Sequence, residues 1–205
     1  MQSARKVRGM PRASAADAAR TAQRILDAAL ERFTSDGYAA ASVDDIARAA
    51  GVTRGAVYHH YADKRGLLRA AARAGHERVA AAIVRRAEGE TEPAEQLRAG
   101  SHAFVDSITT DAAARLLLIE APAVLGWSEW RGLDAAASVA ELREAVALVA
   151  PASDVEALTQ LLSGAMNEGA LWLMERGGDA EARAALHRSL DRLIDAVISS
   201  PAPPR

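Results

Sequence analysis

Apolar residues recur along the chain at the three- and four-residue spacing of helices, and no stretch alternates with the two-residue period of a strand. The pattern therefore predicts an all-α protein. In the early segment RILDAALERFTSDGY, one helical face collects Ile25, Leu26, Ala29, Leu30 and Phe33. Helices are expected at about residues 24–38, 43–50, 54–60, 63–86, 93–108, 112–121, 128–149, 155–176 and 179–198, with the sixth ending at Pro122.

Capping signals divide the segment SVDDIARAAGVTRGAVYHHYADK into two short helices and the start of a third. Ser42 followed by Asp45 has the form of a capping box at a helix start, and Gly51 suits the end of that helix. Thr53 and Asp63 can cap the next two helices. Two short helices joined by a tight turn are typical of a helix-turn-helix.

The second short helix has an outward face suited to a DNA groove. Arg54 can donate to guanine edges or to phosphate, and the small Ala56 can touch a thymine methyl group. Lys64, beside the free amides of the third helix start, favours a phosphate. Asp44 and Asp45 are acidic, so the first short helix is not expected to contact bases.

Charge is divided unevenly along the chain. Residues 1–78 carry 14 Lys and Arg against 8 Asp and Glu, a net charge of +6, and the remainder carries 11 against 19, a net charge of −8. A basic N-terminal module beside an acidic body is expected of a DNA-binding protein. The first fifteen residues carry four basic residues and no acid. They either become ordered on phosphate or form a solvated tail.

Several classes of protein are excluded or disfavoured. The chain has no cysteine, so disulfides and thiolate metal sites are excluded and a reducing cytoplasm is expected. No apolar run is long enough for a membrane helix, and the N-terminus lacks the apolar core of a secretory signal. No motif of a nucleotide-binding or hydrolytic enzyme is present. Adjacent His59 and His60 would point about 100° apart on a helix. We therefore expect no enzyme activity, no cofactor and no metal.

The run I-A-x-x-A-G-V-T-x-G-x-V-Y-x-H-Y, followed by K-x-x-L-L, resembles the DNA-binding domain of the TetR (TetR/AcrR) family of bacterial transcriptional regulators. The resemblance covers about residues 16–78, and Tyr61 stands where the family more often has Phe. It implies mostly phosphate contacts for Ser42, Tyr58, His59 and Lys64. Arg54 and Ala56 are the expected base readers. The whole implied DNA face consists of Ser42, Thr53, Arg54, Gly55, Ala56, Tyr58, His59 and Lys64.

The resemblance also implies a two-domain organisation. We expect a disordered basic arm (1–15), an N-terminal three-helix helix-turn-helix DNA-binding domain (16–62) and a connecting helix (63–88). A larger C-terminal helical ligand-binding and dimerisation domain (89–200) would follow, and then a disordered tail (201–205). The segment GETEP, residues 89–93, interrupts the helical pattern at the domain boundary.

The last two predicted helices, the eighth and ninth, are the expected interface of a homodimer. TetR relatives pair these helices into a four-helix bundle, which would place two recognition helices about 34 Å apart. Glycine inside a helix costs about 1 kcal/mol relative to alanine, and close helix approach would offset that cost. Part of the apolar stripe must also cover the domain's own core. The candidate interface residues are Leu161, Gly164, Ala165, Gly169, Leu190, Leu193, Ile194 and Val197.

All three tryptophans lie in the C-terminal part of a chain that is only 4% aromatic. Tryptophans can fill a core, and they can equally line an apolar pocket with a few polar groups, the usual form of a small-molecule site. The candidate pocket residues are His102, Phe104, Leu117, Glu120, Trp127, Trp130, Met166, Asn167 and Trp172.

Together these features favour a ligand-responsive, sequence-specific regulator of transcription. In this hypothesis a repressor leaves a palindromic double-stranded DNA operator when a small apolar or amphipathic effector binds the C-terminal domain. Two other functions stay open: an architectural DNA-binding protein without a ligand, and a ligand-binding protein whose DNA module is vestigial. Activation in place of repression is also compatible with the sequence.

Overall fold

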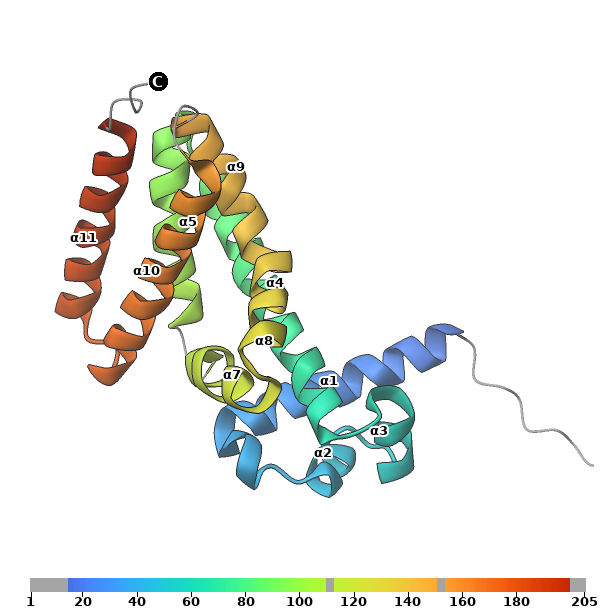
Figure 1. Cartoon of the computed structure of the whole chain (residues 1–205). Helices are drawn as coiled ribbons and strands as arrows, with labels where there is room; N and C mark the ends of the chain where they lie inside the picture. The colour runs from blue at the N-terminus through green and yellow to red at the C-terminus, as the bar shows by residue number, and fades with distance from the viewer. Residues whose placement is uncertain (1–14, 110–112, 151–153, 200–205) are drawn as a thin grey trace, which may run out of the picture.

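The computed structural model describes residues 15–109, 113–150 and 154–199, which form helices with no strand among them, so the all-α expectation is confirmed. The helices α1 (Ala15–Ala40), α2 (Val43–Ala49) and α3 (Arg54–Tyr61) gather at one end of the molecule (Figure 1). The long helix α4 (Lys64–Ala87) leads from them to the opposite end. The predicted arm (1–15) and tail (201–205) lie outside the described residues, apart from Ala15.

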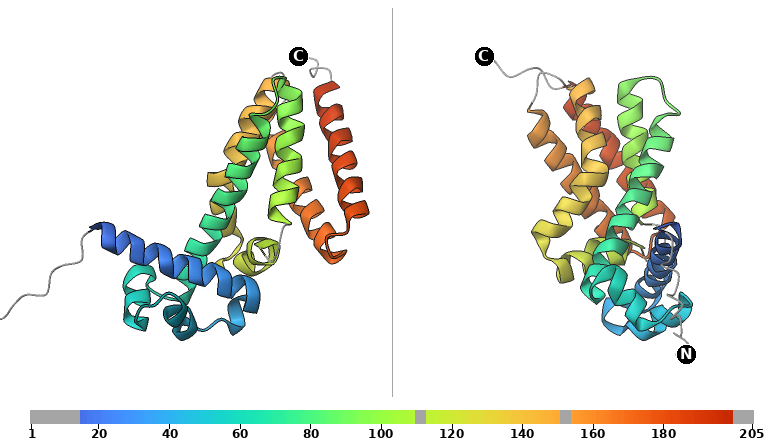
Figure 2. Two further views of the ribbon diagram at one scale, coloured as in Figure 1. Left: turned by 180° about the vertical axis from the view of Figure 1, so that it is seen from behind. Right: turned by 90° about the vertical axis from the view of Figure 1, so that its right-hand side faces the viewer.

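The second domain is a bundle built around α4 and α5 (Pro93–Ile108), which run antiparallel and pack against each other more extensively than any other pair (Figure 2). The hairpin of α10 (Val155–Glu175) and α11 (Ala180–Ser199) covers one side of α5. The helix α9 (Ala140–Val149) packs against both α5 and α10. The boundaries of α5, α10 and α11 agree with the sequence prediction to within two residues.

The helix expected to end at Pro122 continues past it, so that boundary was wrong. The segment α6 (Ala113–Arg115), the π-helical turn η1 (Leu116–Glu120) and α7 (Ala121–Leu125) follow one another directly, and Gly126, with φ 86°, ends the run. Proline is excluded from a helix interior because it has no amide proton and its ring clashes with the preceding turn. The π turn pairs the Ala121 amide with the Leu116 carbonyl, so Pro122 falls in the first turn of α7, where proline is tolerated.

A second π-helical turn interrupts the helix predicted at 128–149. The helix α8 (Trp127–Asp134) passes directly into η2 (Ala135–Val139) and then into α9, without a break in the helical path. Single π turns inside α-helices are frequent at functional sites. This continuous run therefore connects the region of α7 and α4, which α8 contacts, with the region of α5 and α10, which α9 contacts.

One hydrophobic core extends through both domains. Its buried residues include Phe33 and Leu67 from the N-terminal helices and Phe104, Leu117 and Leu173 from the C-terminal bundle. The two domains therefore share apolar packing and are not joined by a flexible linker. No described helix is both long and apolar enough to cross a membrane.

Candidate nucleic-acid interface and ligand cavity

The helices α2 and α3 form the predicted helix-turn-helix. The Ser42 hydroxyl accepts a hydrogen bond from the Asp44 amide at 3.1 Å and starts α2, whereas the Asp45 carboxylate pairs with Arg48 at 2.5 Å. The turn passes through Gly51, whose φ of 64° suits glycine. Ser42 thus caps the helix as the sequence predicted, while Asp45 is engaged further along the helix.

The helix α3 is stabilised by a cap at its start and by a buried side chain on its inner face. The Thr53 hydroxyl accepts from the Ala56 amide at 3.2 Å, and the buried Val57 packs into the core. Thr53, Arg54, Gly55, Tyr58 and His59 are exposed, and Ser42 and Ala56 are half-buried. The structure thus gathers the predicted α3 residues on one outward face. As a DNA-binding surface this face stays a prediction.

Arg54, the expected base reader, is engaged by neighbouring side chains. Its guanidinium donates to the Asp44 carboxylate at 2.8 Å and to the Tyr58 hydroxyl at 2.9 Å. The hydrogen bond to Tyr58 and the charge of Asp44 raise the pKa of Arg54. Sequence reasoning missed the role of Asp44, because the pairing depends on how α2 and α3 cross. The predicted contact of Arg54 with a base or phosphate would require it to release this carboxylate.

Lys64 connects two helices of the N-terminal domain. Its ammonium group donates to the Ala39 carbonyl at 3.3 Å and lies 4.5 Å from the centre of the Tyr38 ring. The Asp63 carboxylate accepts the Gly66 amide at 2.6 Å, so this amide at the start of α4 is not free as the sequence suggested. Lys64 remains partly accessible beside the end of α1, and its phosphate contact stays a prediction.

The corner between α3 and α4 is unusually tight. Ala62 has φ 60° and ψ −55°, and the Asp63 amide donates to the Tyr61 carbonyl at 2.6 Å, which closes a three-residue γ-turn. A β-carbon on Gly66 would lie only 2.2 Å from the Tyr61 carbonyl oxygen. Gly66 is therefore required for α4 to leave α3 at this angle. Sequence reasoning did not single out Gly66.

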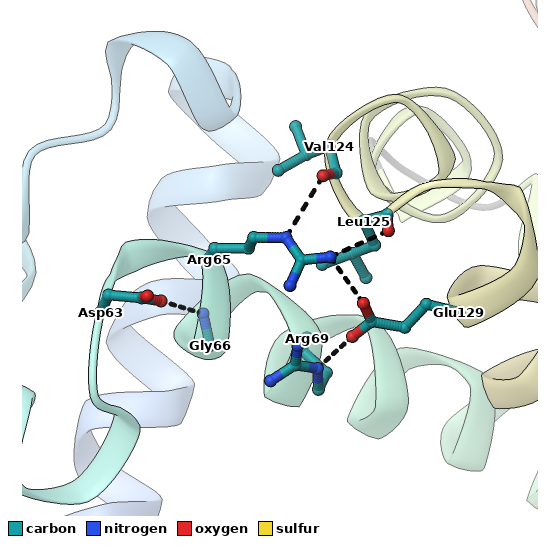
Figure 3. Close-up of polar contacts among 7 residues, drawn as sticks. All are labelled: Asp63, Arg65, Gly66, Arg69, Val124, Leu125 and Glu129. Atoms are coloured by element: carbon teal, nitrogen blue, oxygen red, sulfur yellow. Dashed lines mark hydrogen bonds and ion pairs between the residues drawn. The ribbon is translucent and has the colours of Figure 1, made fainter.

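A cluster of polar contacts joins the start of α4 to the second domain (Figure 3). Arg65 donates to the Leu125 carbonyl at 2.9 Å and to the Glu129 carboxylate at 2.6 Å. Arg69, one helical turn later, donates to the same carboxylate. The hydrogen bond from Arg69, together with that from Arg65, lowers the pKa of Glu129. We call Arg65, Arg69 and Glu129 the α4–α8 clamp.

A second contact joins the domains at the end of α1. The Glu120 carboxylate accepts the Tyr38 amide at 2.8 Å and pairs with Arg115 at 3.0 Å. Gly37, with φ 80°, allows this approach, because a β-carbon there would lie 2.8 Å from the Glu120 carboxylate. Glu120 was a candidate pocket residue, and the structure places it at the domain interface.

A cavity of about 250 Å³ opens among the helices of the bundle, near the C-terminal end of α4. Its walls come from α4, α5, α8, η2, α9 and α10, and most of them are apolar. Buried polar groups also line it, among them Asp134 at the end of α8 and Ser138 in η2. The lining residues are Ile83, Val84, Ala87, Glu88, Gln96, Leu97, Gly100, Ser101, Phe104, Asp134, Ser138, Val139, Glu141, Leu142, Glu144, Ala145, Leu148, Ser163 and Met166.

Of the residues predicted to line a pocket, only Phe104 and Met166 contribute to this cavity. Leu117 lines a separate cleft against α1. Trp127 is 67% exposed, and the indole of the buried Trp130 donates to the Leu117 carbonyl at 2.6 Å.

The other predicted pocket residues lie elsewhere in the bundle. His102 stacks on His187 of α11, with ring centres 4.1 Å apart, and its Nε2 atom lies 2.9 Å from the Asp191 carboxylate. Asn167 is buried outside the cavity lining, and Trp172 lies beneath the Arg176 guanidinium. The described residues contain no group of three or more His, Asp or Glu side chains that could hold a metal ion.

Asp134, in the cavity lining, is a buried carboxylate that lies beside a buried histidine. Asp134 is 1% exposed, and its carboxylate pairs with Arg131 at 2.9 Å and lies 3.8 Å from Nδ1 of the fully buried His76. Burial lowers the pKa of His76, and the nearby Asp134 opposes that shift in part. His76 is therefore neutral in the folded protein near pH 7.

Acid should destabilise the fold through His76. Because folding lowers the pKa of His76, its contribution to stability is complete above the unfolded value of about 6.5 and is lost as the pH falls below it. We expect the free energy of unfolding in urea to decrease between pH 7.5 and 5.5. The decrease should be smaller in His76→Leu, and an equal decrease in both proteins would contradict this assignment.

The predicted dimer stripe divides into two sets in the structure. Leu190 and Ile194 are buried in the protein's own core, and Gly169 allows close contact with Leu186 of α11. Leu161 is 69% exposed and Leu193 is 48% exposed. Gly164 is also open, and Ala165 and Val197 are half-buried. The second set remains available for a partner, and the interface stays a prediction.

Two family models match this chain. The one described as "Bacterial regulatory proteins, tetR family" matches residues 25–71, and "Tetracyclin repressor-like, C-terminal domain" matches residues 94–197, about half of the chain. The HTH-type transcriptional repressor Rv1474c of Mycobacterium tuberculosis is 35% identical over 134 residues, which are 65% of this chain and 71% of that protein. Three further HTH-type regulators are 48–56% identical, but the alignments span only 27–46% of their lengths.

Solved structures share the fold. A TetR-family regulator from Pectobacterium atrosepticum has a TM-score of 0.75 and 26% identity, covering 92% of this chain and all of that one. FadR from Bacillus subtilis, in complex with stearoyl-CoA, has a TM-score of 0.69 and 19% identity, covering 86% and 97% of the two chains. With both of its domains matched, the chain belongs to the TetR family of bacterial transcriptional regulators, which bind DNA through a helix-turn-helix and are not enzymes.

Proposed function

We propose that this protein is a ligand-responsive repressor that binds a palindromic operator as a homodimer and leaves it when a small molecule occupies the cavity. The observation that carries the proposal is the continuous helical run α8–η2–α9. The same run lines the cavity through Asp134 and Ser138 and holds α4 through Glu129. A ligand that displaces η2 would therefore also displace the start of α4.

The start of α4 is coupled tightly to the recognition helix. The γ-turn at Ala62 and the close approach of Gly66 to Tyr61 leave little freedom at the corner between α3 and α4. A shift of Arg65 would thus tilt α3. Such control requires the ligand to bind the DNA-competent and DNA-incompetent states with different affinities.

The clamp gives a test of this coupling. Glu129→Gln keeps the shape of the side chain but removes the charge that holds Arg65 and Arg69. We expect the variant to bind ligand normally, while the ligand-induced loss of operator affinity becomes smaller. Fluorescence anisotropy of labelled operator, with and without saturating ligand, measures the change. Glu175→Gln, exposed at the end of α10, is the matched control, and an unchanged response in Glu129→Gln would refute the role of the clamp.

The exposed residues of α10 and α11, among them Leu161 and Leu193, support a homodimer. The double variant Leu161→Glu/Leu193→Glu places four carboxylates in the proposed symmetric interface and should produce a monomer in analytical ultracentrifugation. Ile119→Glu, at a position in η1 that is as exposed as Leu193, should leave the dimer intact. A double variant that sediments as the wild type does would move the interface elsewhere.

Selection from random DNA duplexes at two salt concentrations tests the function as a whole. Recovery of one palindrome with half-sites about one helical turn apart would support a dimeric, sequence-specific regulator. Recovery of no consensus, with binding lost steeply as salt rises, would favour an architectural DNA-binding protein. No DNA binding together with ligand binding would favour a ligand-binding protein, and expression of a reporter gene distinguishes repression from activation.

A further inference from the structure

The ionisable side chains that line the cavity are all acidic. Its lining contains four carboxylates, on Glu88, Asp134, Glu141 and Glu144, and no Lys, Arg or His side chain. The remaining walls are largely apolar and include Phe104 and other side chains of α4, α5 and α9. The cavity therefore combines a surface for an apolar body with groups that favour positive charge.

The three glutamates form an acidic rim that the protein does not neutralise. Glu88 at the end of α4 and Glu141 and Glu144 on α9 are exposed, and no described Lys or Arg forms an ion pair with them. Two nearby arginines are engaged elsewhere: Arg86 pairs with Glu90 at 2.9 Å, and Arg143 pairs with Glu156 at 3.6 Å. Arg85, in the last turn of α4, is exposed and is absent from the cavity lining. The rim thus presents negative charge from two helices at the cavity.

A second, independent feature lies deeper in the cavity. The Ser138 side chain is only 6% exposed, and its hydroxyl has no hydrogen-bond partner among the described residues. Buried polar groups in native proteins usually have a partner, because leaving one unsatisfied is costly. Ser138 lies in the π-helical turn η2, the segment that connects the cavity to the clamp. A polar group of a bound molecule would satisfy this hydroxyl.

We propose that the effector is an amphipathic cation, with its positive group at the acidic rim, its apolar body in the cavity and a small hydrogen-bonding group at Ser138. This inference rests on the proposed function, since it names the ligand class of the same regulatory site. An anionic amphiphile of equal length would place its charge beside uncompensated glutamates. A molecule of this class contacts α4, α9 and η2 together, and the last contact is the one that reaches the clamp.

Matched ten-carbon probes test the proposal on the full-length protein. Decyltrimethylammonium, decanoate and 1-decanol share the apolar chain and differ in charge. By isothermal titration calorimetry we expect the cation to bind about tenfold more tightly than the anion, because attraction and repulsion at partly exposed carboxylates each contribute modestly. The difference should narrow as salt is raised.

Two variants separate the two parts of the site. Glu141→Gln/Glu144→Gln should weaken binding of the cation about fivefold and leave 1-decanol unchanged, whereas Glu175→Gln should change neither. A hydroxyl group added at the free end of the decyl chain of decyltrimethylammonium should tighten its binding to the wild type. The same hydroxyl group should give no gain in affinity for Ser138→Ala. Circular dichroism of each variant checks that the fold is kept.

The outcomes distinguish this inference from the proposed function. Decanoate binding as tightly as the cation, or no binding of any probe, would overturn the cationic ligand class. A cation that binds as expected but leaves operator affinity unchanged would sustain the ligand class and overturn ligand-responsive repression. Retained binding of the cation in Glu141→Gln/Glu144→Gln would show that the rim is not its site.

Discussion

Replacing Gly66 with alanine is expected to lower the melting temperature by roughly 6–12 °C and to abolish specific DNA binding. The new methyl group would lie 2.2 Å from the Tyr61 carbonyl oxygen, and a backbone atom cannot move aside as a flexible side chain can. Overpacking of this kind costs about 3 kcal/mol, and each kcal/mol shifts the melting temperature of a chain this long by about 2–4 °C. Differential scanning calorimetry and operator binding measure the two effects.

Gly132→Ala is the matched control for this experiment. Gly132 is also helical, and a β-carbon there meets no atom within 4 Å. Alanine in an open helix is more favourable than glycine by about 0.5–1 kcal/mol, so this variant should be slightly more stable than the wild type. If both variants melt at the same temperature, the corner between α3 and α4 is not as rigid as its geometry indicates.

Arg54→Ala is expected to weaken operator binding by about 1–3 kcal/mol and to relax the preference for one base of each half-site. Arg54 is the basic side chain on the outward face of α3, and Tyr58 holds its guanidinium at 2.9 Å. Quantitative binding to a set of operators, each altered at one position, measures both effects. Unchanged affinity and preference would show that another residue reads the base.

Two further variants test how the neighbours of Arg54 on the predicted DNA face affect binding. Lys64→Ala should weaken all operators alike, because a phosphate contact carries no sequence information. Asp44→Asn should strengthen binding, because it removes a negative charge from the DNA face and releases Arg54 from its 2.8 Å ion pair. If the Asp44→Asn variant binds the operator more weakly than the wild type, Asp44 is needed to orient Arg54 on the base.

Local signals in the sequence were sufficient for the helix-turn-helix and for the starts of α2, α3 and α4. Ser42, Thr53 and Asp63 all cap the helices that follow them, because a short polar side chain before an apolar periodic run bonds the first free amides. The path through Pro122 could not be predicted, since a π turn leaves no clear mark in the pattern of apolar residues.

Features that depend on how distant helices cross were beyond the sequence. The tryptophans suggested the pocket, yet Trp130 fills the core and Trp127 lies at the surface. The cavity forms where six elements meet, and its polar residues, such as Ser138, are unremarkable in the sequence. The same holds for Asp44, whose partner is ten residues away on another helix.

The shared core has a consequence for exchanging DNA-binding modules between relatives. Tyr38 bonds to Glu120, Arg65 bonds to Leu125 and Glu129, and Phe33 belongs to the same buried cluster as Leu117. A chimera cut only between residues 62 and 63 would therefore place a foreign surface against η1 and would keep the native α4 clamp beside it. A functional graft needs two discontinuous pieces, the N-terminal helices through Arg69 and the segment 115–130, transplanted as one unit.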